Sequence, residues 1–224
     1  LNSEYIEYSG TTKFAVAKLK VHLKNQESTL RTDSLYFDRK KQEAYYNIFG
    51  EISSEETVIR SQSGTYFADD NKYEFITNVH VTDPSFTIHS ERMDYYTELR
   101  HAYFYGATTI NGESYDVKCN RGFFDSNLKK GYFQDRASID YNLRNIEGDS
   151  IYFDDRIQYA SASRNVQITD TIGNNVIRGQ YGEIFKERDS AIVTRSPIAI
   201  KLVDKDSLFI HADTLLATGP AEER

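Results

Sequence analysis

A repeat with a period of ~29 residues runs along the whole chain and limits the folds open to it. Its clearest mark is a column of acids and their amides, whose spacing is constant from Glu4 to Asp149 and slightly longer after it. Self-similarity at a fixed period is typical of proteins that stack one supersecondary unit on the next. The column contains Glu4, Asp33, Gln62, Glu91, Asn120, Asp149, Gln180 and Asp213.

Further columns keep the same register, so the repeat is not a chance match. The residue before each acid or amide is small, as at Ser3, Thr32, Ser61, Ser90, Cys119, Gly148, Gly179 and Ala212. The residue three before it is aliphatic, as at Leu1, Leu30, Ile59, Ile88, Val117, Ile146, Ile177 and Ile210. A closing aliphatic column holds Leu23, Ile52, Val81, Ile110, Ile139, Ile168 and Ile200, and an aromatic column holds Tyr46, Phe75, Phe104 and Phe133 and ends at Ala162.

Within each copy the apolar residues alternate with polar ones, which is the pattern of a β-strand. Tyr46, Ile48, Gly50 and Ile52 are predicted to share one face, and short polar links such as 38–43 are predicted to be hairpin turns. Seventeen Tyr and thirteen Phe against three Pro also favour strands over helices. Each copy is therefore predicted to form two antiparallel strands.

Two features break the simple alternation. Leu30 and Leu35 are separated by an odd number of positions, so both face inward only if the strand kinks or bulges, and the small-residue column lies at that kink.

A second column should face inward but becomes charged in its later copies. A bulge there would turn the charged residues outward. The alternative is that the interior opens or becomes polar there. This column is Ile48, Thr77, Gly106, Asp135 and Arg164.

Composition excludes several classes of protein. The chain has 224 residues and a formal net charge of −7, which argues against a nucleic-acid partner because phosphate binding needs a clustered cationic surface. A single cysteine excludes an internal disulfide framework and a cysteine-rich zinc site. The five histidines lack ligand spacing, and catalytic motifs such as HExxH and GxSxG are absent. We therefore predict no enzyme, no cofactor and no metal site.

The compact copies resemble the OstA-like repeat family. They are RTDSLYFD (31–38), SQSGTYFAD (61–69), SERMDYYTE (90–98) and EGDSIYFDD (147–155), each with a small residue, an acid or amide and aromatic residues before a hairpin. The resemblance covers nearly the whole chain. Members of the family include a periplasmic lipopolysaccharide-transport bridge protein and the N-terminal domain of its outer-membrane partner.

The resemblance implies an all-β fold, an elongated open twisted β-jellyroll built from ~29-residue repeats of two bent antiparallel strands. It implies one such domain over residues 1–224, in a chain that we expect to be a processed or truncated piece of something longer, without its signal peptide. The implied function is a periplasmic carrier that shields lipopolysaccharide acyl chains in an apolar groove. The implied partners are lipopolysaccharide, and end-to-end contacts with further copies or with other proteins of the same transport system.

The inward columns are the candidate lipid-binding residues. Burial of acyl chains along them would stabilise the complex by ~0.8 kcal/mol per methylene. The predicted groove residues are Leu30, Phe37, Tyr46, Ile52, Ile59, Tyr66, Phe75, Val81, Ile88, Tyr95, Phe104, Ile110, Val117, Phe124, Phe133, Ile139, Ile146 and Phe153.

Competing interpretations remain for these patterns. The same columns could fill a closed core, in which case the protein is a structural or adhesive β-solenoid spacer, and a polysaccharide-active β-helix is a third and weaker option. The acid and amide column could bind cations, although a turn or capping role is favoured because the glycine-rich nonapeptide of calcium-binding β-rolls is absent. A largely basic column could bind phosphate, although a solvated face is favoured; it holds Arg31, Arg60, His89, Lys118, Arg178 and His211.

Overall fold

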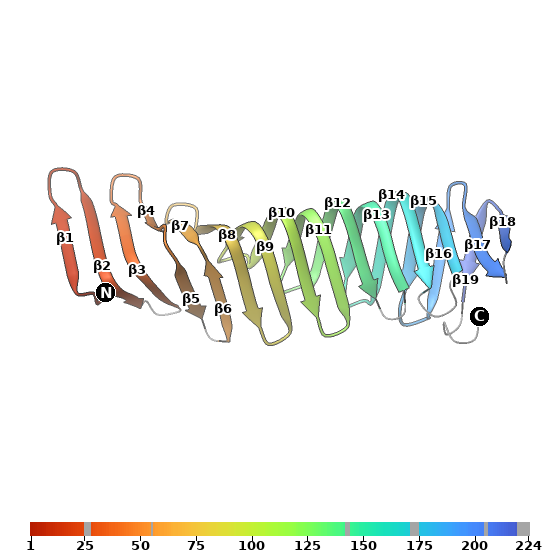
Figure 1. Cartoon of the computed structure of the whole chain (residues 1–224), viewed down its shortest axis with the longest axis horizontal. Coiled ribbons are helices and arrows are strands. Elements are labelled where there is room, and N and C mark those ends of the chain that lie inside the picture. Colours follow the sequence, from red (N-terminus) through yellow and green to blue (C-terminus); the bar gives the residue numbers. More distant parts are fainter. Residues whose placement is uncertain (25–27, 55, 142–143, 171–174, 204–205, 219–224) are drawn as a thin grey trace. The chain divides into compact units, whose positions relative to one another are not determined.

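A computed structural model describes residues 1–24, 28–54, 56–141, 144–170, 175–203 and 206–218 of the chain. Nineteen β-strands and no helix occur among these residues, which confirms the all-β prediction (Figure 1). The chain divides into two compact units, Leu1–Ile110 and Asn111–Arg224. Whether the chain is a single repeat domain stays a prediction, because the two units are described separately.

The first unit contains β1–β9 and most of β10. Their bounds are β1 Tyr5–Ser9, β2 Phe14–Lys24, β3 Thr29–Asp38, β4 Glu43–Tyr46, β5 Gly50–Ser54, β6 Thr57–Ser61, β7 Ser63–Phe67, β8 Lys72–Asp83, β9 Phe86–Tyr96 and β10 His101–Gly112. The second unit contains β11 Tyr115–Asp125, β12 Lys130–Tyr141, β13 Arg144–Asp154, β14 Tyr159–Asp170, β15 Asn175–Phe185, β16 Ser190–Thr194, β17 Ile198–Val203, β18 Asp206–His211 and β19 Thr214–Ala217.

Strand pairing in the first unit separates two walls. The start of β3 pairs with β5, whereas its end pairs with β4. β4 then pairs with β7, and β5 pairs with β6. The long strand β8 contributes to both walls, because it pairs with β6 in one wall and with β7 in the other. A long strand therefore crosses from one wall to the other, and the four short strands belong to one wall each.

Strands β11 to β15 of the second unit are continuous, and each pairs antiparallel with the next along the chain. They are 11 or 12 residues long and bend in the middle rather than breaking. Only at β15 does the pairing divide, between β16 and β17. The two-strand repeat predicted from the columns is confirmed in this unit.

Two consecutive residues in the left-handed backbone conformation produce the bend in β12. Between Gln134 and Ala137 the register of β12 shifts against β13, and the two extra residues lie opposite Asp149 alone. Both have positive φ, which few non-glycine residues adopt, and a two-against-one bulge of this kind bends a strand. Pairs with positive φ recur at Leu19 and Lys20, Thr77 and Asn78, Asp135 and Arg136, Arg164 and Asn165, and Arg195 and Ser196.

The bulges show which way the charged residues of the column Ile48 to Arg164 point. Asp135 and Arg164 are exposed, and both lie at a register shift, so the bulge interpretation is confirmed. The prediction of uniform alternation from Tyr46 to Ile52 is wrong at Ile48. Ile48 is 52% exposed, because it lies in the break between β4 and β5 rather than on the inward face.

The acid and amide column lies opposite the bulges and bonds to them. The backbone N–H of Gln62 donates to the carbonyl oxygen of Thr77 at 2.9 Å, and that of Gln180 donates to the carbonyl of Arg195 at 3.2 Å. The Asp149 carboxylate accepts a hydrogen bond from the Asn165 amide at 3.1 Å. These bonds satisfy polar groups that the bulge removes from the ladder. The column lies opposite the bulges rather than in turns, and its predicted turn or capping role stays a prediction.

Candidate functional site

The interior of the second unit is filled by side chains of the predicted columns. Phe133, Ile139 and Phe153 are each 0% exposed, and Phe124 is 1% exposed. Aromatic rings interlock here, since the Phe153 ring centroid lies 4.6 Å from that of Tyr115 and 5.6 Å from that of Tyr141. Protein interiors packed in this way leave few voids larger than a water molecule.

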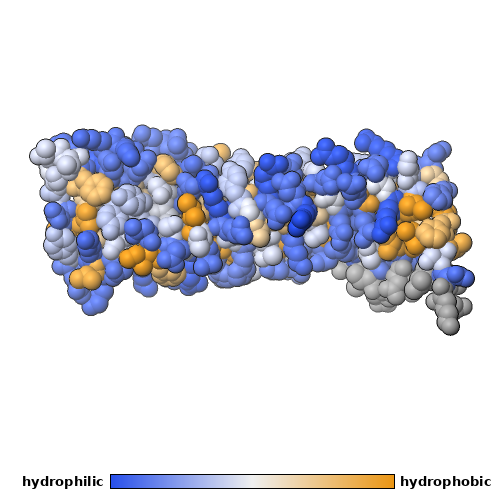
Figure 2. Space-filling view, turned by 45° about the horizontal axis from the view of Figure 1, so that its top comes forward, coloured by the Kyte–Doolittle hydropathy of each residue, from blue (hydrophilic) through white to orange (hydrophobic). Residues whose placement is uncertain are grey.

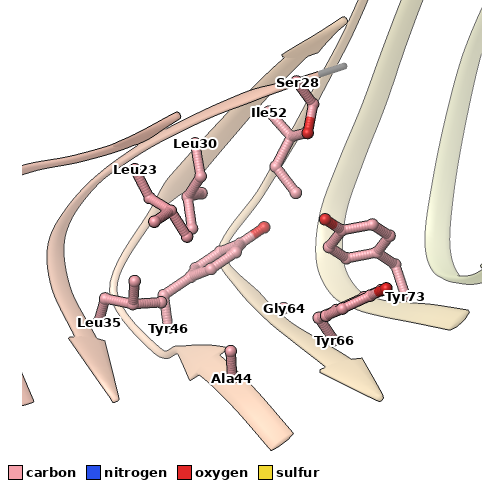
Figure 3. Close-up of a pocket in the computed structure, with 10 residues that line it drawn as sticks. All are labelled: Leu23, Ser28, Leu30, Leu35, Ala44, Tyr46, Ile52, Gly64, Tyr66 and Tyr73. Atoms are coloured by element: carbon pink, nitrogen blue, oxygen red, sulfur yellow. The ribbon is translucent and has the colours of Figure 1, made fainter. Parts of the chain in front are cut away.

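The first unit instead contains a pocket between its walls (Figure 3). Its empty volume is about 450 Å³ when the part open to solvent is included. The Tyr46 ring points into the middle of this space, with leucines on one side and two further tyrosines on the other. The lining residues are Leu23, Ser28, Leu30, Leu35, Ala44, Tyr46, Ile52, Gly64, Tyr66 and Tyr73.

The pocket is apolar and uncharged. None of the ten described lining residues is ionised near neutral pH, and the tyrosine hydroxyls are the main polar groups. Tyr46 and Ser61 share a hydrogen bond of 2.7 Å between their hydroxyls. Burial raises the pKa of Tyr46 to about 12 and that of Tyr73 to about 12, because desolvation disfavours the charged phenolate. The pocket therefore stays neutral across the physiological range.

Two glycines make room for the central ring. A Cβ on Gly64 would lie 2.6 Å from atoms of the Tyr46 side chain, and one on Gly50 would lie closer still to the same ring. Real Cβ atoms do not approach so closely, so Tyr46 requires glycine at both strands. The ring thus rests directly on the backbone and leaves the space beside it open.

A further column, which we call the rim column, differs in side-chain size between the pocket and the second unit. Its members recur once per repeat at or beside strand starts, and they change from small to large along the chain. In the second unit Tyr115 contacts Phe153, and Arg144 forms an ion pair with Asp189. In the pocket the corresponding residue is a serine. The rim column consists of Ser28, Thr57, Phe86, Tyr115 and Arg144.

At the pocket, the rim residue Ser28 makes a hydrogen bond instead of filling the space with a large side chain. Ser28 hydrogen-bonds to the Tyr73 hydroxyl, and Figure 3 shows these two side chains near each other at one side of the pocket. One hydrogen bond contributes a net ~0.5–1.5 kcal/mol, far less than the burial of an aromatic ring. The pocket can therefore be opened more cheaply than the filled interior of the second unit.

Four of the predicted groove residues line the pocket: Leu30, Tyr46, Ile52 and Tyr66. Phe37 and Tyr95 are partly exposed. The other twelve predicted residues are buried in the interiors of the two units and line no described pocket: Ile59, Phe75, Val81, Ile88, Phe104, Ile110, Val117, Phe124, Phe133, Ile139, Ile146 and Phe153. Their contact with lipid stays a prediction.

The sequence prediction missed six lining residues. Leu23 belongs to the closing aliphatic column and could have been included on that ground. Tyr73 carries a stronger sequence signal, because it stands in a column in which other copies carry small residues such as Ala15, Ala44 and Ala102. An aromatic residue in an alanine column signals extra space at that copy. The remaining four are Ser28, Leu35, Ala44 and Gly64.

The described residues contain no larger metal-ligand cluster and no reactive thiol. They contain no group of three or more His, Cys, Asp or Glu side chains placed to hold a metal ion. No helix long and apolar enough to cross a membrane occurs among them. Cys119 is buried, and burial raises the pKa of its thiol to about 12, so the thiol stays protonated and unreactive near neutral pH.

Comparison with known proteins assigns the first part of the chain. The family model for OstA-like protein matches residues 1–91. Residues 1–91 are therefore similar to this family, and we call them the OstA-like segment. The resemblance seen in the sequence is thereby confirmed for this segment, and every residue that lines the pocket lies within the OstA-like segment.

One solved structure is similar to part of the chain, at a low level. It is the crystal structure of LptH from Pseudomonas aeruginosa, described as the LptA-homologous periplasmic component of the conserved lipopolysaccharide transport device. The match has 14% sequence identity and a TM-score of 0.44, and it covers 46% of this chain and 79% of that chain. No curated protein matches the chain.

Proposed function

We propose that this protein is a non-enzymatic periplasmic carrier that shields lipopolysaccharide acyl chains during transport to the outer membrane. The observation that carries the proposal is the uncharged, mainly apolar pocket between the two walls of the OstA-like segment. An acyl chain that enters it loses contact with water, which stabilises the complex by ~0.8 kcal/mol per buried methylene. Such binding needs no catalytic group and no cofactor.

The arrangement of the walls supports sliding rather than fixed binding. Leu30 and Ile52 belong to columns that repeat the same chemistry in every copy, so successive positions along the interior offer an acyl chain similar contacts. Similar contacts mean similar free energies, and a ligand can then move between them without a deep trap. The pocket would be the first such position, and the predicted groove residues of later copies would receive the chain if the walls separate there.

End-to-end contacts with a second copy or a related protein are part of this proposal. Figure 1 draws β1 at the end of its row of strands, and β1 pairs with β2. Its side chains Tyr5, Ile6 and Tyr8 are all about half exposed. A strand with exposed apolar side chains invites pairing with another chain. Figure 2 shows a mainly hydrophilic surface elsewhere on its visible face, with separate hydrophobic areas.

The alternative is a spacer with a closed core, and the filled interior of the second unit favours it for that part of the chain. Phe104 in the first unit is also 0% exposed, so the interior of the first unit is already filled near its end at Ile110. A spacer would bind no lipid at any position. The two functions therefore differ in whether the pocket residues contact lipid.

A photo-crosslinking experiment distinguishes the two. A photoreactive residue replaces Leu30, which lines the pocket, and a matched control replaces Arg31, which is the next residue on β3 and is exposed. The carrier predicts that purified lipopolysaccharide labels position 30 and not position 31, and that unlabelled lipid competes. Equal or absent labelling in folded protein would establish the spacer. A third probe at Phe104 reports whether lipid also enters the filled interior.

A further inference from the structure

Two histidines face each other on the outer surface of the first unit. His80 of β8 lies directly opposite His89 of β9, and their Nδ1 atoms are 3.1 Å apart. The ring centroids are 4.2 Å apart, and the ring planes meet at 70°. The residues before and after each of them are buried, so both imidazoles point away from the interior.

The distance between the two nitrogens suits one metal ion. An ion bound to both at the usual metal–imidazole length of ~2.05 Å would have an N–metal–N angle of about 98° for this separation. That angle lies between the right angle of neighbouring square-planar ligands and the tetrahedral value. Imidazole nitrogens are preferred ligands of zinc and copper. We propose that His80 and His89 together bind a divalent transition metal such as Zn²⁺ or Cu²⁺, with water as the remaining ligands.

Without metal, the short contact requires one Nδ1 to donate a hydrogen bond and the other to accept it. A metal requires both Nδ1 lone pairs, so each neutral ring carries its proton on Nε2 instead. Only the ring that donated through Nδ1 changes tautomer, and neither ring loses a proton overall. His89 is exposed, which leaves water free to complete the coordination shell.

The backbone holds the pair in place before any ion arrives. The register pairs ten residues of β8 with ten of β9, and the histidines lie inside this ladder. Ligands fixed in this way lose little conformational entropy on binding. The nearest cation along the same row is Arg60, which lies opposite His80 and is held by Glu51 at 2.8 Å. The glutamate offsets the charge of the arginine.

The equivalent position of another copy provides an internal control. His22 of β2 lies opposite Arg31 of β3, so this row has one imidazole and a guanidinium, which does not bind metal. His22→Gln removes a histidine from the same outer face without touching the pair. It therefore tests whether binding depends on His80 and His89 or on any histidine.

The test is isothermal titration of the untagged full chain with Zn²⁺, together with the electron paramagnetic resonance of added Cu²⁺. We expect one ion per chain and a Cu²⁺ spectrum with two imidazole nitrogens. His80→Gln and His89→Gln should each weaken binding at least about tenfold, since losing even an outer-shell partner costs that much. His22→Gln should change nothing. Affinity that persists in both single variants, or the absence of binding to the folded chain, would overturn the proposal.

Discussion

The two units are built from one repeat but have different interiors. In the first, Tyr46 stands beside an open space of about 450 Å³, whereas in the second its column partner Phe133 is fully enclosed. The columns that the sequence repeats are the same in both. The comparison shows that the columns specify two walls, and that a few side chains outside them specify whether the space between the walls is filled.

Two local differences account for this. The rim column carries Ser28 at the pocket and Tyr115 in the second unit, where the larger side chain reaches Phe153. The strands also differ, because β4 and β5 are separate in the first unit while β12 is continuous. A break also separates β16 from β17 in the second unit, so we expect the pocket to need both the break and a small rim residue that leaves the gap unbridged.

The largest expected effect is on stability. Phe133→Ala removes a fully buried ring from a filled interior and should lower the free energy of unfolding by ~3–5 kcal/mol. Leu30→Ala should cost less, about 1–2 kcal/mol, because Leu30 is only half-buried beside an existing space. Denaturant unfolding of both variants measures the difference. Equal losses would mean that the first unit is packed as tightly as the second.

Tyr115→Ser should give the second unit an opening like that of the first. The change removes the ring that contacts Phe153 and should lower the free energy of unfolding by ~2–4 kcal/mol. A photoreactive residue at Phe124 should then label with lipopolysaccharide in the variant and not in the parent chain. Tyr132→Ser serves as the control, because Tyr132 is 53% exposed on the outer face. Labelling that stays absent in a folded variant would show that the rim residue does not control access.

Ser28→Phe is the reverse change and should close the pocket. The ring would occupy pocket space beside Tyr73 and should reduce labelling at position 30 several-fold, while the free energy of unfolding changes by less than ~1.5 kcal/mol. Thr57→Phe is the matched control, since it is the next member of the rim column but does not line the pocket. If both variants label like the parent chain, lipid reaches Leu30 by another route.

Sequence reasoning predicted the walls better than the space between them. Phe133 and Ile139 were assigned to the interior because their columns hold register over many copies, and both are fully buried. Ile48 was misplaced because a break in the strand depends on backbone geometry that alternation does not encode. The pocket itself could not be predicted from the columns. It depends on Ser28 and Tyr73, two residues that depart from their neighbours in other copies.

The smallest expected effect is at Cys119, where the repeat itself supplies the replacement. In the equivalent position Ser61 donates a hydrogen bond to the carbonyl of Ser63 at 2.9 Å, and Ser90 donates to that of Arg92 at 3.0 Å. A serine at 119 would find the same acceptor two residues on, so its buried hydroxyl would be satisfied.

Cys119→Ser should therefore change the free energy of unfolding by less than ~1 kcal/mol, whereas Cys119→Val, which fills the site without a donor, should cost more through overpacking at the bend. Unfolding of the two variants in denaturant measures both values. A large loss of unfolding free energy for the serine variant would mean that the bend of the second unit differs from that of the first. The two units would then share their columns but not the geometry of their bends.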